Sequence, residues 1–257
     1  MNRHLAVSPC SNPSFSLETA LSNYSLLGYT QFEVFTSWAA SAVDLGASPA
    51  DYLTLGQRYG MKFSSMHLPP VEENDLENTV RRAIEATQFA QALGVTNVIF
   101  KANSRPAYIA AAKSYLDGIA GLGVTPVLQN HRGTPISSLE DFREVIAGID
   151  DPHLQTLLEV GQFERAGVAW QEGFELLAAN STIGLVHFRD MQDGKDVPFG
   201  KGSIDIKLLF KLMHDINYDG NFVVEMELEN RDDEETLQRL GEARVYAETL
   251  LKEAGYE

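Results

Sequence analysis

Short apolar runs alternate along the chain with longer segments in which apolar residues recur at helical spacing. A short, mostly apolar run is typical of a strand that is buried on both faces of a sheet. Such runs predict strands at Leu5–Ser8, Phe32–Phe35, Lys62–His67, Asn97–Lys101, Pro126–Gln129, Leu154–Val160, Ile183–Phe188 and Phe222–Met226. Turn residues bound the seventh run, with Asn180-Ser181 before it and Asp193-Gly194 after it.

The segments between these strands carry the signals that begin and end helices. Ser16 provides an N-cap for the first helix, and Gly28 ends it. A proline follows Ser48 at the first helical position of the next helix, and Gly60 ends that helix. Besides Leu17–Leu27 and the helix between Ser48 and Gly60, the spacing predicts helices at Leu76–Leu93, Arg105–Ile119, Ser138–Ile149, Arg165–Ala179, Ile204–Asn217 and Asp233–Ala254.

A strand followed by a helix repeats about every 30 residues, which is the size of one βα unit. Eight such units in 257 residues, without a linker-like or low-complexity stretch, predict a single (β/α)8 TIM barrel over residues 1–257. The alternative is a doubly wound α/β sheet. That fold usually has a glycine-rich phosphate turn after its first strand, but Ser8-Pro-Cys-Ser-Asn-Pro contains no glycine. The pattern therefore favours the barrel.

The composition narrows the classes of partner. The chain has 36 acidic and 20 basic residues, which gives a formal net charge of −16. Because such a surface repels polyanions, we expect no nucleic acid and no anionic membrane as partner. The single cysteine, Cys10, allows neither an internal disulfide nor a thiolate metal cluster. There is no apolar signal core at the N-terminus and no run of about 18 apolar residues, so a cytoplasmic location is expected.

Polar residues stand at the carboxyl ends of the predicted strands, where barrel enzymes build their active sites. They are Ser8, Glu33, His67, Lys101, Gln129, His131, Glu159, His187, Arg189, Glu225 and Glu227. Side chains alternate between the lumen and the helix layer along a strand. His187 shares its side with Leu185, and Glu225 shares its side with Val223, so both are expected to point into the mouth of the barrel.

A charge in the mouth of the barrel is costly unless it is paired or bound to a metal. For Glu225 the functional interpretation is favoured over a structural ion pair. His187 could equally be a satisfied core histidine followed by an ordinary polar turn. Glu33, His67 and Lys101 could simply reach solvent at the rim, so both interpretations stay open for these three residues.

Three motifs are similar to those of one known family. They are Val186-His-Phe-Arg-Asp190, Gly200-Lys-Gly-Ser-Ile-Asp205 and Tyr218-Asp-Gly-Asn-Phe-Val-Val-Glu225. With them the chain resembles, over essentially its whole length, the sugar phosphate isomerase/epimerase family of xylose isomerase-like TIM barrels. The resemblance implies one divalent metal (Mn, Mg, Co or Zn), with ligands that correspond by position to Gln129, Glu159, His187 and Glu225. It also implies a small sugar or sugar phosphate as substrate and a homo-oligomer as a possible state.

The chain departs from the family pattern at two of these four positions, Gln129 and Glu159, and at a third position nearby, Gln162. Gln129 stands where the family commonly has glutamate, and an amide can coordinate a hard cation but carries no charge and accepts no proton. Glu159 replaces aspartate, which keeps the charge and adds a methylene group. Gln162 replaces a histidine that contacts the substrate in relatives. The formal charge of the ligand set therefore falls from about −3 to about −2, which weakens divalent binding without abolishing it.

The loss of one carboxylate also bears on the chemistry that the resemblance implies. Family epimerases use two glutamates on opposite faces of the intermediate, whereas here Glu225 is left as the one obvious base. A two-base epimerisation is therefore disfavoured, and a one-base isomerisation or dehydration stays open, with Glu225 as base and Lys101, His67 or His131 assisting. Four further residues are expected to bind substrate: His131, Gln162, Arg189 and Glu33.

Two other functions compete with that of a metal-dependent isomerase, or related lyase, acting on a small sugar. The first is a barrel with altered or lost catalysis that binds a carbohydrate or a protein partner. The second is a phosphodiesterase like endonuclease IV. It is disfavoured because that chemistry needs a trinuclear zinc site rich in histidine, whereas this chain has six histidines in total. The net charge of −16 also opposes DNA binding. If the substrate carries a phosphate, the basic residues expected to hold it are Lys101, Arg132, Arg189 and Lys201.

Overall fold

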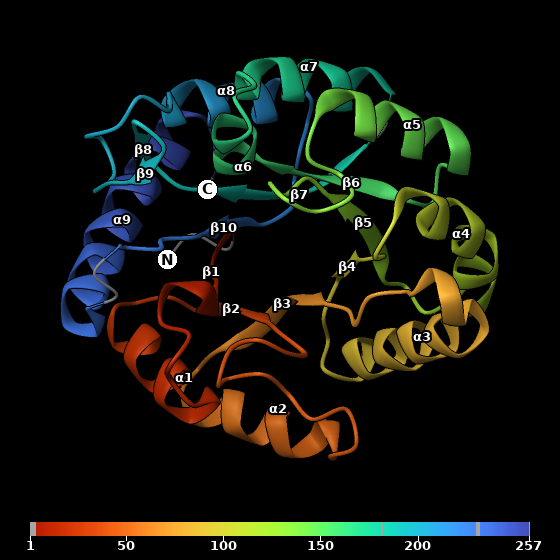
Figure 1. Cartoon of the computed structure of the whole chain (residues 1–257). Helices are drawn as coiled ribbons and strands as arrows, with labels where there is room; N and C mark the ends of the chain where they lie inside the picture. The colour runs from red at the N-terminus through yellow and green to blue at the C-terminus, as the bar shows by residue number, and fades with distance from the viewer. Residues whose placement is uncertain (1–3, 181, 230–231, 257) are drawn as a thin grey trace.

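The computed structural model describes residues 4–180, 182–229 and 232–256. Parallel strands form a closed barrel, and helices surround it (Figure 1). Around the barrel the strands are β1 Leu5–Val7, β2 Gln31–Val34, β3 Lys62–His67, β4 Asn97–Phe100, β5 Thr125–Gln129, β6 Gln155–Glu159, β7 Ile183–Phe188 and β10 Phe222–Val224. The barrel closes where β10 pairs with β1, with Leu5 opposite Phe222. The predicted barrel is confirmed, and each strand end lies within two residues of its predicted position.

The helices follow the strands as the capping signals predicted. They are α1 Leu17–Leu26, α2 Pro49–Arg58, α3 Leu76–Ala92, α4 Arg105–Ile119, α5 Leu139–Ile149, α7 Trp170–Asn180, α8 Ile206–Asp215 and α9 Asp233–Glu253. The hydroxyl of Ser16 accepts a hydrogen bond from the Thr19 amide at 3.2 Å, which is the expected N-cap. Two short 3-10 helices, η1 Pro9–Ser11 and η2 Glu73–Asp75, were not predicted. None of the helices in the described part of the chain has the length and apolar character that a membrane crossing needs.

The prediction of one helix over Arg165–Ala179 was wrong. A short helix α6, Val160–Arg165, begins directly after β6, and α7 begins only at Trp170. Between the two helices Gly167 adopts a φ of 76°, and the Val168 amide donates back to the Phe163 carbonyl at 3.0 Å. This is the left-handed ending that glycine gives a helix. Ser181, which was predicted as a turn residue, lies outside the described residues.

A second feature that the sequence did not predict is a small hairpin after β7. Strands β8, Met191–Gln192, and β9, Lys195–Asp196, pair antiparallel. Asp193 and Gly194 have φ values of 53° and 77° in the connecting turn. Asp-Gly favours this tight turn, because both central residues need a positive φ. The hairpin folds the chain back so that Asp196 lies beside the end of β7.

One layer of apolar side chains fills the barrel lumen just below the strand ends. It consists of Ala6, Ile99, Val127, Leu157, Leu185 and Val223, which form a buried cluster of their own. Residues two positions further along a strand point the same way. All six strands that contribute to this layer therefore carry a polar residue directly above it: Ser8, Lys101, Gln129, Glu159, His187 and Glu225. Phe222 and Val224 of β10, and Met226 just after it, pack outward in the helix-facing core, as predicted.

Candidate active site

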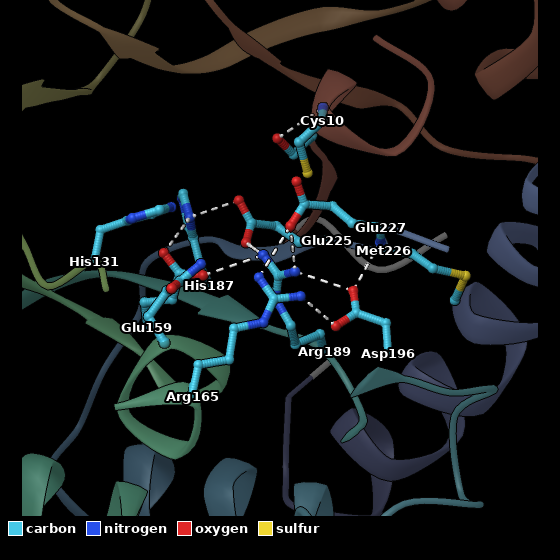
Figure 2. A network of polar contacts seen from close by, with 12 residues as sticks. Cys10, His131, Glu159, Arg165, His187, Arg189, Asp196, Glu225, Met226 and Glu227 are labelled. Atoms are coloured by element: carbon cyan, nitrogen blue, oxygen red, sulfur yellow. Dashed lines mark hydrogen bonds and ion pairs between the residues drawn. The ribbon is translucent and has the colours of Figure 1, made fainter. Parts of the chain in front are cut away.

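Glu159, His187 and Glu225 meet at the mouth of the barrel, as Figure 2 shows. The Nδ1 atom of His187 lies 3.2 Å from Oε1 of Glu225 and 3.8 Å from Oε2 of Glu159. All three side chains are buried. The expected convergence of these strand ends is therefore confirmed.

Arg189 occupies the other side of the same two carboxylates (Figure 2). Its Nη2 atom donates to Oε1 of Glu159 at 3.2 Å and also to Oε2 of Glu225. Its Nη1 atom donates to Glu227 at 2.9 Å and to Asp196 at 3.0 Å. The guanidinium, predicted to bind substrate, thus lies in a cluster of four carboxylates that belong to the protein itself.

Burial and these charges push the pKa values of the two central carboxyl groups in opposite directions. Burial raises the pKa of Glu159 well above its ordinary value, and the nearby charge of Glu225 adds to the rise. Burial would also raise the pKa of Glu225, but Arg189 and His187 outweigh it and hold that pKa well below the ordinary range. The ionised form is therefore favoured at Glu225 and disfavoured at Glu159.

Asp196 and Arg165 complete this cluster and were not predicted as site residues. Arg165 donates to Asp196 at 2.8 Å and to Glu227 at 3.1 Å, and the Glu227 amide donates to Asp196 at 2.7 Å. The Asp-Gly turn of the hairpin was the sequence signal that could have placed Asp196 next to Arg189. Nothing local in the sequence pointed to Arg165, because its contacts come from α6 reaching across to other loops.

Glu33 lies beneath the cluster and contacts two histidines at once. Its Oε1 atom is 2.9 Å from Nε2 of His187, and its Oε2 atom is 3.2 Å from Nε2 of His67. The Ser65 hydroxyl donates to Glu33 at 2.9 Å. Burial would raise the pKa of Glu33, but the two imidazoles lower it below its ordinary value. Glu33 is fully buried and does not border the cavity directly, and its part in substrate binding stays a prediction.

The two glutamines that depart from the family pattern have different neighbours. The Gln129 amide donates to Oε2 of Glu159 at 2.6 Å, so Gln129 does face the candidate ligand set. Gln162 accepts a hydrogen bond from the Arg132 amide at 3.2 Å and is buried. Asn130 fixes β5 to β6 through two hydrogen bonds with the backbone of Glu159, at 3.1 Å and 3.2 Å.

These side chains border a cavity of about 480 Å³, a size within the usual range of roughly 300–1,000 Å³ for small-molecule sites. The predicted residues in its wall are His67, Lys101, Gln129, His131, Glu159, Gln162, Arg189 and Glu225. The wall also contains Cys10, Phe35, Trp38, Tyr108 and Glu227, to which the sequence had assigned no role. Burial lowers the pKa of Lys101 to about 8 and that of His67 to about 4. The cavity therefore combines acidic, basic and aromatic groups in one space.

Asp190 ends the motif Val186-His-Phe-Arg-Asp190, and it fixes the position of the motif Gly200-Lys-Gly-Ser-Ile-Asp205. Its carboxylate accepts hydrogen bonds from the amides of Gly200 at 2.8 Å and Gly202 at 2.9 Å. A Cβ atom at Gly202 would collide with the carboxylate of Asp190, which explains the glycine there. These two motifs therefore fix the loop after β9 and keep it against the end of β7.

The donor set fits a divalent metal. One oxygen of each carboxylate, Oε2 of Glu159 and Oε1 of Glu225, faces Nδ1 of His187, while the other oxygen of each is used by Arg189. The buried Nδ1 makes no hydrogen bond of good geometry. Two carboxylates and one imidazole suit a catalytic site that has three protein ligands. A second buried group, Glu33, His67 and His187, shares the same imidazole.

Comparison with known proteins identifies the family of this chain. The model of the xylose isomerase-like TIM barrel family matches residues 22–246. The chain is 28% identical to the L-ribulose-5-phosphate 3-epimerase UlaE of Escherichia coli over 111 residues, which are 42% of this chain and 37% of UlaE. The stretches aligned with the first curated relatives cover 31% to 43% of the lengths of those proteins.

Solved structures share the fold at low sequence identity. A D-tagatose 3-epimerase-like protein has a TM-score of 0.77 at 17% identity, over 99% of this chain and 100% of that one. The IolI protein, solved with a binding zinc atom, has a TM-score of 0.77 at 14% identity, over 100% of this chain and 99% of that one. At these identities the likeness shows the fold alone. The family match extends over most of the sequence, and the chain belongs to the xylose isomerase-like TIM barrel family.

Proposed function

We propose that this protein is a metal-dependent isomerase or epimerase-like enzyme, or a related lyase, that acts on a small sugar or sugar phosphate. The observation that carries the proposal is the buried meeting of Glu159, His187 and Glu225 in a cavity large enough for a monosaccharide. A proton is removed next to a polarised carbonyl group in such chemistry, and the cavity provides both a base and a place for a cation. The name of the curated relative UlaE supports a sugar substrate.

The residues that would hold the metal are Glu159, His187 and Glu225, with Gln129 or water completing the coordination. A divalent cation bound there would polarise the substrate carbonyl and stabilise the negative charge that develops on its oxygen. The zinc atom named for the structural neighbour IolI supports a metal-dependent activity. The identity of the metal among Mn, Mg, Co and Zn is left to experiment.

Glu225 is the proposed base, and the pKa directions support that role. Its carboxyl group has a lowered pKa and is ionised at neutral pH, while the pKa of Glu159 is raised. A pair of carboxyl groups with separated pKa values is a common basis for assigning acid and base. Lys101 would donate a hydrogen bond to the oxygen that gains charge, and His67 at the end of the neighbouring strand would assist. His131 and Gln162 would bind substrate hydroxyl groups.

Gln129 makes a one-base reaction the favoured form of this chemistry. The position opposite Glu225 that carries the second carboxylate in family epimerases holds an amide here, and this amide already donates to Glu159. An amide cannot take up the proton that a two-base epimerisation must return. Aldose–ketose isomerisation or dehydration needs only one base.

One observation favours a second candidate, a barrel that binds a carbohydrate or a partner protein without turnover. Arg189 already neutralises Glu159 and Glu225, and Gln129 donates to Glu159. Both features would let the carboxylate pair persist without a metal. Metal content and turnover separate the two candidates.

The test is metal analysis followed by proton NMR in D2O. Protein purified without chelator should contain close to one divalent metal per chain. With a panel of ketoses, aldoses and their phosphates, the metal-loaded enzyme should exchange a carbon-bound proton of its substrate for deuterium. Glu225→Gln should abolish exchange, while Glu175→Gln on the exposed side of α7 serves as the control. Absence of both metal uptake and exchange across the panel would favour the binding barrel.

Four further sequence predictions stay predictions: the cytoplasmic location, the exclusion of nucleic acid and of membranes as partners, the homo-oligomer, and the single domain over residues 1–257.

A further inference from the structure

The wall of the cavity includes an indole ring that the proposed chemistry does not use. Trp38 lies in the loop between β2 and α2 and borders the same cavity as Glu225. Trp38 is 61% exposed, whereas tryptophan is highly buried on average. Among the described residues it is the one aromatic side chain in the group of exposed large hydrophobic residues, whose other members are Leu26, Leu45, Ile216 and Val245.

The backbone holds Trp38 in a conformation that a bulky residue rarely adopts. Its φ is 75°, and the Ala39 amide donates to the Ser37 carbonyl at 3.0 Å across it. This is a γ-turn of the rarer and more strained kind. A non-glycine residue in such a position is uncommon and is more often found at functional sites.

Hydrogen bonds fix the backbone on both sides of this turn, so the surrounding structure keeps Trp38 in its strained conformation. The Ala40 amide donates to the Pro13 carbonyl at 2.8 Å, and the Val43 amide donates to the Phe35 carbonyl at 2.9 Å. Thr36 donates through its hydroxyl to the His67 carbonyl at 2.9 Å. Glycine would satisfy the same backbone without strain, so the tryptophan side chain is not explained by the turn itself.

A row of rings leads from Trp38 down to the buried histidines. The rings of Trp38 and Phe35 have centroids 5.8 Å apart, and Phe35 packs edge-on against His67 at 4.3 Å. His67 in turn lies 6.0 Å from His187, again between ring centroids. One wall of the cavity is therefore aromatic, whereas Glu159, Glu225 and Glu227 make another wall acidic.

We propose that Trp38 is a binding residue on which the C–H face of the sugar stacks while the sugar's hydroxyl groups face the acidic wall. The face of an indole is apolar and electron-rich, and the C–H groups on one face of a sugar complement it. The division of the cavity into an aromatic and a charged wall matches a ligand that has one apolar face and polar edges. The inference rests on the proposed function, because it assumes a carbohydrate ligand, and it assigns the residue that orients it.

Intrinsic fluorescence gives a direct readout, because the chain has only two tryptophans. Trp170 is 1% exposed, so its emission should not respond to a ligand in the cavity. Titration of the Mg²⁺-loaded protein with L-ribulose or D-tagatose should shift the emission of Trp38 to shorter wavelength in a saturable manner. Trp38→Phe should remove this shift and retain binding within a few-fold, as measured by calorimetry.

Trp38→Gly separates a binding role from a structural one. Glycine accepts a φ of 75° without strain, so the melting temperature should stay unchanged or rise. The dissociation constant of the sugar should nevertheless increase by about tenfold or more. A role in structure alone would instead lower the melting temperature and leave the affinity of the folded protein unchanged.

Three results would overturn the inference, and they differ from one another. If calorimetry detects sugar binding but the emission stays constant and Trp38→Gly binds equally well, stacking is wrong and the proposed function stands. If the emission shifts with protein concentration instead of sugar, Trp38 is covered by a second copy of the chain. If no sugar or sugar phosphate binds at all, the proposed function fails and the inference fails with it.

Discussion

Replacement of Gln129 by glutamate tests the metal site most directly. Gln129 donates to Oε2 of Glu159 at 2.6 Å, so the substitution replaces a hydrogen-bond donor with a second negative charge. Two carboxylates at that separation repel by about 6 kcal/mol at an effective dielectric constant of about 20. Because one of them can take up a proton and relieve most of the repulsion, we expect the metal-free variant to lose about 2–3 kcal/mol of unfolding free energy.

A divalent cation should reverse this loss. The added carboxylate supplies a charged ligand in place of a neutral one, so we expect metal to bind at least about tenfold more tightly, equivalent to about 1.4 kcal/mol. Urea unfolding with and without Mn²⁺, together with calorimetric metal titration, measures both effects. Gln162→Glu is the matched control, because it adds the same charge to the same cavity while its partner is the Arg132 amide.

Unchanged metal affinity in Gln129→Glu, or an equal gain in Gln162→Glu, would refute the ligand assignment. The activity of Gln129→Glu then separates two explanations for the glutamine at position 129. If the ancestral ligand has simply been lost, turnover should rise and epimerisation could appear through the restored second base. If the neutral amide suits a one-base reaction, turnover should fall even though metal binds more tightly, because an extra anion lies beside the developing negative charge.

Three further predictions follow from the buried charges. Glu33→Gln removes the carboxylate that contacts the imidazoles of His187 and His67, so metal affinity measured by titration should fall about 10- to 100-fold. Unchanged affinity would show that Glu33 does not orient His187. Activity should fall as pH rises through about 8, where Lys101 loses its proton, and Lys101→Arg should remove this alkaline limb, because arginine stays charged; a limb that persists in the variant would exclude Lys101 as its cause. Arg189→Met leaves four carboxylates without their shared cation and should cost about 3–5 kcal/mol in urea unfolding; a loss below about 1 kcal/mol would mean that the cluster is not held by this charge.

The sequence alone determined the barrel and the side of the strands on which the site lies. Both follow from local rules: the alternation of apolar runs with helical segments gives the βα repeat, and the alternation of side chains along a strand gives the lumen. Leu185 and Val223 point into the lumen, so His187 and Glu225 must lie above them whatever the rest of the chain does. The break at Gly167 was also visible in the sequence, and the prediction of one continuous helix passed over it.

Only the tertiary structure decided which acidic side chains pair with which basic side chains. Arg189 pairs with residues that are 30, 36 and 38 positions away in the sequence as well as with one on the adjacent hairpin. Closure of the barrel brings Glu33 against His187, although the two residues lie far apart in the sequence. Local patterns fix the direction of a side chain, whereas its partner depends on how strands distant in sequence are brought together, because electrostatic pairing depends on distance in space and not along the chain.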